Sequence, residues 1–332
     1  MRMPHRFAQT LFASVILITL SSVALAADPG SPLPAASEVS DQKTGSVLFY
    51  NLFSSSAANP NVENTRFNIT NTNTSFSAAV HLFFVDGTTG EPTDATICLT
   101  PNQTASFLAS EIDPGTTGYL VAVAIDNATG CPIRFNFLSG DAFVKLATGH
   151  EANLGAEAFA ALYTGTLPGC SANSTTAALN FDGTSYNRAP RVLAVDRIRS
   201  PNDGNSTLLV LNRVGGSLVT GVSPIGTMAG LLFDDQTGLS SFIFASDRPQ
   251  FRALLSDSFP PIIPPLSSVI PSGHTGWLKV YATEEVGLLG AVINFNPDAV
   301  SSPPAFNSGH NLHKLTLSTT NTFVIPIRQP RC

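Results

Sequence analysis

Residues 115–137 read GTTGYLVAVAIDNATGCPIRFNF, and residues 273–295 read GHTGWLKVYATEEVGLLGAVINF. Placed over each other without a gap, the two stretches are identical at seven of their 23 positions, including the final Asn-Phe. This match indicates a duplication, and repeats of this size are whole domains rather than solenoid units. Glycine supplies the turn and the aromatic residue after it opens a strand, so each copy predicts a β module.

Short apolar runs rich in β-branched and aromatic residues continue on both sides of the repeat. Turn signals separate these runs, and the hairpin signal at residues 86–87, Asp-Gly, is the strongest of them. The pattern predicts an all-β fold of two tandem antiparallel β-sandwich modules with at most one short helix. Residues 152–162 have helical spacing, so a short helix or an irregular segment is expected there.

The chain divides into five expected segments. They are a signal peptide at 1–26, a flexible leader at 27–45, a β-sandwich module at 46–165, a linker at 166–190 and a second module at 191–332. Arg2 and Arg6 precede an apolar stretch and small residues ending at Ala26, which is the layout of a secretory signal. We therefore expect an exported chain, extracellular or at the cell surface, with the periplasm as an alternative and no transmembrane segment after cleavage.

The composition narrows the classes of partner. The formal net charge is −6, and only 12% of the residues are charged. Nucleic acid is not an expected partner, because phosphate binding needs concentrated Lys and Arg. Low charge together with edge-prone strands leaves self-association open.

Four cysteines, Cys98, Cys131, Cys170 and Cys332, predict disulfides in an exported chain. Three pairings are possible. We expect Cys98 to pair with Cys131 inside the first module, and Cys170 to pair with Cys332 across the second. No C-x-x-C pair exists, which disfavours a zinc site built from cysteines.

Each module ends in a similar segment, GHEANL at residues 149–154 and the shorter GHNL at residues 309–312. In this respect the chain resembles exported bacterial proteins built of tandem, immunoglobulin-like β-sandwich modules whose function is uncharacterised. The resemblance implies the fold and export, and it implies no activity.

Two histidines near the second segment form a candidate metal site. His310 and His313, with a carboxylate, would suit zinc or copper, because imidazole is a good ligand for both. A spacing of three residues places two side chains on one face only in a helix, whereas Leu315 and Leu317 suggest strand alternation. We therefore expect turn or interface histidines here, and no motif implies a cofactor.

An aromatic strip is the candidate ligand-binding surface. Trp277, Lys279 and Tyr281 would share one face of a strand, opposite Leu278 and Val280. If that face is exposed, the strip would bind a sugar or a protein. The favoured alternative places the chain's single tryptophan in the core.

Catalytic motifs are weak. No Gly-x-Ser-x-Gly elbow occurs, and the adjacent acids at residues 234–235 and 284–285 would point to opposite faces of a strand rather than form a glycosidase pair. The sequence favours a non-enzymatic exported protein for adhesion-like binding of a protein or glycan at the cell surface. The alternatives are a structural subunit of a surface layer or appendage, and a secreted hydrolase or metal-dependent enzyme.

Overall fold

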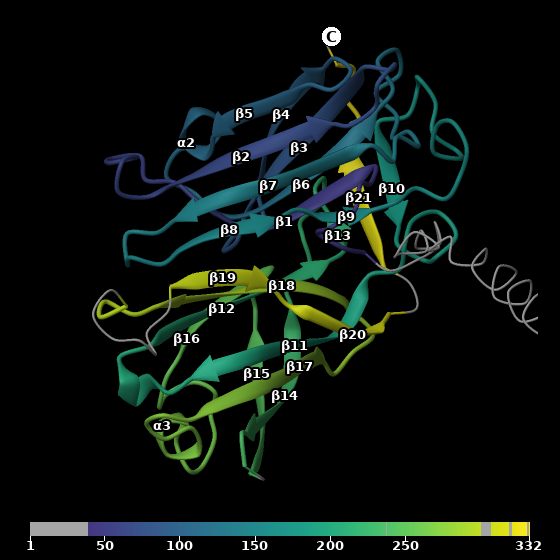
Figure 1. The fold of residues 1–332 in the computed structure, drawn as a ribbon. Helices are drawn as coiled ribbons and strands as arrows, with labels where there is room; N and C mark the ends of the chain where they lie inside the picture. The colour runs from purple at the N-terminus through teal and green to yellow at the C-terminus, as the bar shows by residue number, and fades with distance from the viewer. Residues whose placement is uncertain (1–38, 237, 300–306, 319–320, 331) are drawn as a thin grey trace, which may run out of the picture. The chain divides into compact units, whose positions relative to one another are not determined.

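The computed structural model describes residues 39–236, 238–299, 307–318, 321–330 and 332. The expected signal peptide and most of the expected leader lie outside the described residues. Strands dominate the described part, with the short helices α2 (Ala109–Ile112) and α3 (Leu266–Val269) and the 3-10 turn η1 (Pro201–Asp203). The predicted all-β fold of antiparallel β-sandwich modules is confirmed, with two short α-helices in the described residues where at most one was expected (Figure 1).

The first sandwich packs the five-stranded sheet β4-β3-β6-β1-β9 on the four-stranded sheet β5-β2-β7-β8. Its strands are β1 (Val47–Ser54), β2 (Asn64–Asn71), β3 (Ala78–Asp86), β4 (Pro92–Leu99), β5 (Thr104–Leu108), β6 (Thr117–Ile125), β7 (Leu138–Lys145), β8 (Glu151–Gly155) and β9 (Glu157–Phe159).

The second sandwich packs the sheet β15-β14-β17-β11-β20 on the sheet β16-β12-β18-β19. Its strands are β11 (Pro190–Arg199), β12 (Ser206–Val214), β14 (Gly226–Asp234), β15 (Leu239–Ser246), β16 (Gln250–Leu255), β17 (Thr275–Ala282), β18 (Gly287–Phe295), β19 (Ser308–Asn311) and β20 (His313–Leu317).

The two sandwiches repeat each other strand for strand. Both five-stranded sheets place the first strand of the module between the sixth and the last, and both four-stranded sheets place the second strand between the fifth and the seventh. The ungapped sequence match holds through β6 and β17 only. Residues 136–137 precede β7, whereas residues 294–295 end β18, so the shared Asn-Phe does not occupy equivalent positions.

The alternation of buried and more exposed residues along the strands explains how each core forms. In β17 every second residue is buried, and Leu278 and Val280 join the core of the second sandwich. By contrast, β1 and β3 are buried along almost their whole length, on both faces of the sheet. Such continuous apolar strands require a second covering layer on their outer side.

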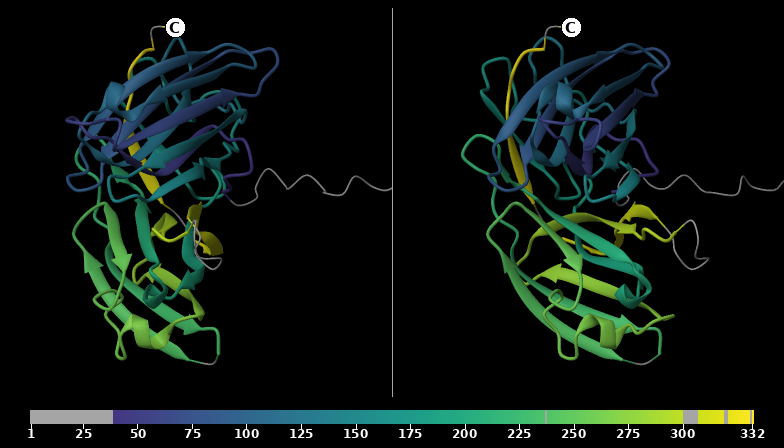
Figure 2. Two further views of the ribbon diagram at one scale, coloured as in Figure 1. Left: turned by 60° about the vertical axis from the view of Figure 1, so that its left-hand side comes forward. Right: turned by 90° about the vertical axis from the view of Figure 1, so that its left-hand side faces the viewer.

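A third sheet supplies that layer. It has the order β10-β21-β13, from β10 (Thr176–Asn180), β21 (Thr322–Pro326) and β13 (Gly216–Ser217). Leu179, Phe323 and Ile325 pack with the outward side chains of the first sandwich's five-stranded sheet. Figure 2 shows β21, in yellow, running along the first sandwich toward the C-terminus. The expected linker therefore holds a strand, and the end of the expected second module packs on the first.

The expected disulfide pairing is wrong. The bonds join Cys98 to Cys332 and Cys131 to Cys170, and each pair has Cα atoms less than 6 Å apart, at 5.7 and 5.9 Å respectively. Because β21 returns to the first sandwich, Cys332 arrives beside β4, which carries Cys98. The expected pairing of Cys98 with Cys131 assumed that each disulfide stays inside one module, whereas the end of the chain returns to the first sandwich.

The helical spacing of residues 152–162 is also misleading, because the structure has β8 and β9 there. Leu154 and Ala158 are four residues apart and both enter the first core. A separation of four positions fits one face of a strand as well as one face of a helix, so it could not distinguish the two.

Residues 39–45, which were expected to belong to the flexible leader, are packed in the structure. Val39 is buried in the core of the first sandwich and its covering sheet, and Ser40 forms a β-bridge with Ala158. Residues 39–45 therefore pack on the sandwich instead of forming part of a flexible leader.

Candidate functional site

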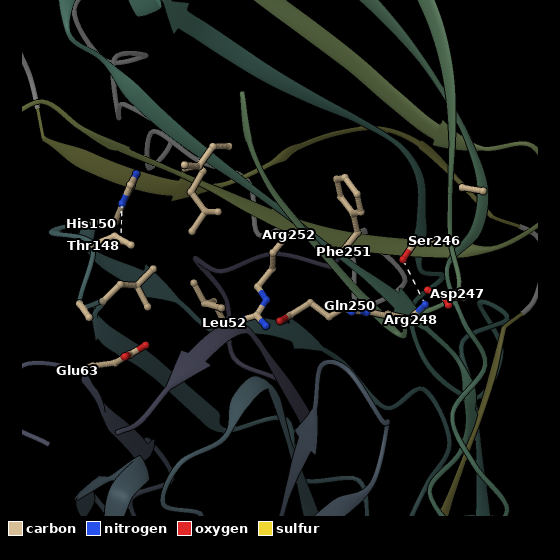
Figure 3. Close-up of a pocket in the computed structure, with 15 residues that line it drawn as sticks. Leu52, Glu63, Thr148, His150, Ser246, Asp247, Arg248, Gln250, Phe251 and Arg252 are labelled. Carbon is tan, nitrogen blue, oxygen red and sulfur yellow. Dashed lines mark hydrogen bonds between the residues drawn. The ribbon is translucent and has the colours of Figure 1, made fainter. Parts of the chain in front are cut away.

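A cavity of about 640 Å³ lies between the two sandwiches (Figure 3). The first sandwich contributes Leu52 of β1, Glu63 and residues 146–148 and 150, and the second contributes Leu208 of β12, residues 245–248 and much of β16. Its volume is in the range that holds a small organic ligand.

A buried amide network joins the sandwiches beside this cavity. Asn212 Nδ2 donates to the carbonyl oxygen of Asn51 at 2.9 Å, and Asn51 Nδ2 donates to Asn311 Oδ1 at 2.8 Å. Gln250 Nε2 donates to the Asn51 carbonyl at 3.2 Å and to Asn212 Oδ1 at 2.9 Å. All four side chains are buried, so the network fixes the position of the cavity's wall.

Gln250 leaves one polar atom unpaired in the wall of the cavity. Its side chain is only 2% exposed, and its Oε1 has no hydrogen-bond partner among the described residues. An unpaired acceptor at such a buried position costs about 1–3 kcal/mol.

Arg252 lies two residues further along β16, on the same side of the strand. Figure 3 shows its side chain extending along the cavity toward Gln250 and Leu52. Within the described part of the chain the guanidinium makes no hydrogen bond or ion pair. Desolvation lowers the pKa of Arg252, while the charges of Asp86 and Glu63 act in the opposite direction. The group stays protonated and presents its donors to the cavity.

Two other ionisable groups of the wall, Glu63 and His150, are engaged in the fold. Glu63 Oε1 accepts a hydrogen bond from Ser54 Oγ at 2.5 Å. His150 contacts Thr148 Oγ1 through Nδ1 at 2.8 Å and the Ser206 carbonyl through Nε2 at 3.0 Å, and burial lowers its pKa. His150 is therefore an interface histidine that joins the two sandwiches.

The predicted aromatic strip lies on the outer face of the second sandwich. Leu278 and Val280 are fully buried, whereas Trp277, Lys279 and Tyr281 are only partly buried. The expectation that the single tryptophan belongs to the core is wrong. Strand β17 is covered on one side only, so alternate residues must face outward.

Trp277 is not an open platform, however. The ring of Phe233, its cross-strand neighbour on β14, stacks on the indole with centroids 4.1 Å apart and an interplanar angle of 5°. The Nζ atom of Lys279 lies 5.8 Å from the indole centroid. One face of the indole is therefore covered by Phe233 and is not offered to a sugar ring.

The two predicted metal ligands are brought together. His310 ends up on β19 and His313 on β20, and the Nε2 atom of each lies 3.3 Å from Asp196 Oδ1 on β11. The helical requirement expected from their spacing does not apply, because the chain changes sheet at Leu312 between them. Nothing in the sequence identified Asp196 as a possible ligand, because its position depends on a shift in the register of β11.

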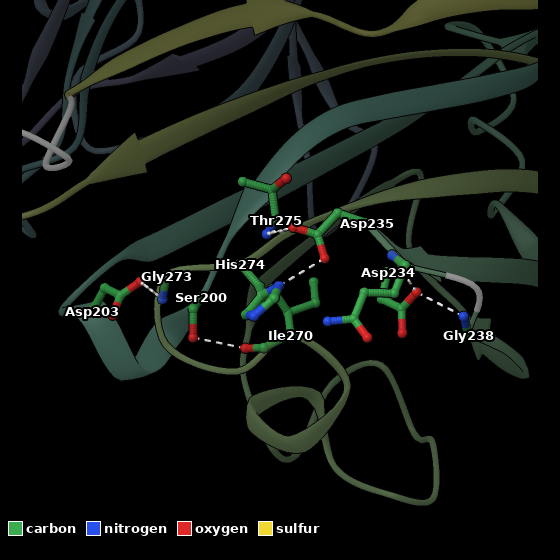
Figure 4. A network of polar contacts seen from close by, with 10 residues as sticks. Ser200, Asp203, Asp234, Asp235, Gly238, Ile270, Gly273, His274 and Thr275 are labelled. Atoms are coloured by element: carbon green, nitrogen blue, oxygen red, sulfur yellow. Dashed lines mark hydrogen bonds and ion pairs between the residues drawn. The ribbon is translucent and has the colours of Figure 1, made fainter.

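The adjacent acids of the second sandwich stabilise turns (Figure 4). Asp234 and Asp235 lie at the end of β14, and Asp235 Oδ1 contacts His274 Nδ1 at 2.9 Å, which lowers the pKa of Asp235. The hydrogen bond from Ser272 similarly lowers the pKa of Asp203. These contacts give the loops their shape and do not form a carboxylate pair across a cleft.

Comparisons with protein-family models, with curated proteins and with solved structures find no match. Among the described residues, no helix is long and apolar enough to cross a membrane. The fold and the geometry of the sites are therefore the basis for inferring function.

Sequence reasoning missed the cavity itself. Gln250 and Arg252 are polar residues that alternate with Phe251 and Ala253 in a short strand, and this alternation was the available signal. Nothing in the sequence shows that the polar face of β16 meets β1 of the other sandwich.

Proposed function

We propose that the chain is an exported, non-enzymatic binding protein that takes part of a glycan into the cavity between its two sandwiches. Export is supported by the two disulfides, which persist in oxidising compartments. It is also the location expected for the tandem β-sandwich proteins that the chain resembles.

The observation that carries the proposal is the unpaired cation Arg252 in the cavity wall. Its exposed guanidinium makes no hydrogen bond or ion pair with the described residues, and it shares one cavity with the polar Gln250 and apolar wall residues such as Leu52 and Leu208. Sugars match this combination, because their rings have apolar C–H faces and their hydroxyl groups both donate and accept hydrogen bonds.

A glycan array tests the proposal. We expect the mature chain to bind a defined set of glycans and Arg252→Ala to lose roughly 10- to 100-fold in affinity, since a hydrogen bond to a charged group contributes about 1.5–3 kcal/mol. Arg66→Ala is the control, because Arg66 is exposed on the first sandwich at β2. Absence of glycan binding, or equal binding by the Arg252 variant, would refute the proposal.

A second candidate function is a structural subunit of a surface layer or appendage. Strand β15 is an edge strand, and its Leu239 and Ile243 side chains are 59% and 66% exposed. Exposed apolar edges favour pairing between copies. If this candidate is correct, light scattering will show the mass of the mature chain rising with concentration, and Ile243→Lys will keep it monomeric. A concentration-independent monomer would exclude it.

A further inference from the structure

Three metal-ligating side chains meet at one edge of the second sandwich. Asp196 Oδ1 lies 3.3 Å from His310 Nε2 and 3.3 Å from His313 Nε2. One ligand atom from each of the three residues lies within 4.8 Å of the others. The side chains are 45%, 43% and 59% exposed, so an ion can reach them from solvent.

Two irregularities of the fold create this meeting point. The register between β11 and β17 shifts between Val195 and Ile198, and Arg197 has a positive φ of 50°, so Asp196 stands in a β-bulge. The chain then passes from β19 to β20 at the buried Leu312, which places His310 and His313 on strands of different sheets.

The hydrogen bond made by His310 Nδ1 leaves Nε2 available to bind a metal. Its Nδ1 lies 2.9 Å from the carbonyl oxygen of Asn311, and since a carbonyl only accepts, Nδ1 carries the proton. When the ring is neutral, the lone pair of Nε2 is directed at Asp196. Backbone carbonyls fix the tautomer of many metal-bound histidines in this way.

The two 3.3 Å distances also fit a cation held between these groups. Charge-assisted hydrogen bonds from nitrogen to a carboxylate are about 2.7–2.9 Å long, shorter than the two 3.3 Å separations. With zinc–ligand bonds of about 2.0–2.1 Å, neighbouring ligands of a tetrahedral site are about 3.3 Å apart.

The duplicated module shows that the fold itself does not require these residues. The first sandwich has the same shift in β1, where Asn51 and Leu52 occupy the bulge. Phe49 of β1 pairs with Glu157, whereas the equivalent pairing in β11 joins Ala194 to His313. The imidazole of His313 is therefore a feature of the second module alone.

We propose that Asp196, His310 and His313 bind a divalent ion of the zinc class through Oδ1 and the two Nε2 atoms. Three protein ligands leave one coordination position for water or an outside ligand. A cavity of about 370 Å³, lined by Asp196 and His310 among others, adjoins the site. Arg197 Nε lies 4.0 Å from Asp196 Oδ2, the oxygen that does not face the histidines.

Zinc titration of the chelator-treated mature chain, in competition with a chromophoric chelator, tests the proposal. We expect one zinc per chain, with His310→Ala and His313→Ala each weakening binding by more than about 100-fold, beyond the loss typical of an outer partner. Asp196→Asn, which preserves shape, should weaken it about tenfold or more. Cobalt should give the intense visible absorption of a tetrahedral complex in the wild type and lose it in His310→Ala.

His274→Ala is the matched control, because His274 is a solvent-accessible histidine paired with Asp235 that has no third ligand among the described residues. Zinc binding retained in this variant and lost in the two others supports the site. The site is disproved if the wild type binds no zinc, if His310→Ala binds as tightly as the wild type, or if His274→Ala loses binding equally. Circular dichroism confirms that each variant is folded.

Discussion

The positions of several functional side chains could not be predicted from the sequence pattern. His310 and His313 are identifiable from the sequence as possible ligands, but Asp196 is not, because a β-bulge places it. Arg252 and Gln250 alternate as strand residues do, and their shared cavity depends on a strand from the other sandwich. Candidate ligands could be predicted where the residue type alone identifies them, as for the two histidines. They could not be predicted where two segments far apart in the sequence must come together.

Glu157 on β9 is a buried carboxyl group that should make stability depend on pH. Burial raises its pKa from 4.5 to about 7, although the ion pair with Lys314 Nζ at 2.7 Å acts in the opposite direction. The folded state therefore holds this proton more tightly than the unfolded state. Consequently, the free energy of unfolding should fall as pH rises from about 4.5 to about 7, by on the order of 3 kcal/mol at about 1.4 kcal/mol per unit.

Urea unfolding of the wild type and Glu157→Gln across this pH window checks the prediction. The wild-type slope should largely disappear in the variant, and Glu151→Gln, at an exposed position of β8, should retain it. The comparison rests on the slope, because Lys314 loses its partner in Glu157→Gln at every pH. An unchanged slope in Glu157→Gln would assign the pH dependence to other groups.

At the scale of elements, strands were predictable and their partners were not. Period-two alternation and turn residues located β2 and β17 because these strands are covered on one side. The spacing in residues 152–162 was ambiguous between helix and strand, and only packing against β1 and β7 resolved it. Strand β21 belongs to the first sandwich's outer layer, although it follows the second sandwich in sequence.

The two disulfides should contribute unequally to stability because they close loops of different length. Cys98 and Cys332 are separated by 234 residues, and Cys131 and Cys170 by 39. Loop-closure entropy predicts roughly 5 kcal/mol for the longer loop and roughly 4 kcal/mol for the shorter. The longer one also holds β21 on the first sandwich, so its loss should free that strand.

Paired Cys→Ser variants test this order. Cys98→Ser with Cys332→Ser should lower the midpoint of denaturant unfolding more than Cys131→Ser with Cys170→Ser, and it should expose β21 to limited proteolysis. The reverse order, or protection of β21 in the first variant, would show that packing of Phe323 and Ile325 holds the strand without the covalent bond.

At the scale of the whole molecule, duplication explains the architecture and its divergence explains the sites. Both modules have the same strand order and a bulge in the first strand. In the first module the bulge residue Asn51 is buried in the amide network between the sandwiches. In the second module the equivalent residue is Asp196, beside two histidines. One scaffold thus supplies a junction in one copy and a candidate metal site in the other.

Hydrogen exchange with a glycan selected on the array shows whether the cavity between the sandwiches is the ligand site. We predict that the glycan slows amide exchange in residues 250–254 of β16 and in residues 146–150 of the first sandwich together, because both line the cavity. Protection confined to the outer face of β17 around Trp277, with none in these two segments, would show that the cavity is not the ligand site.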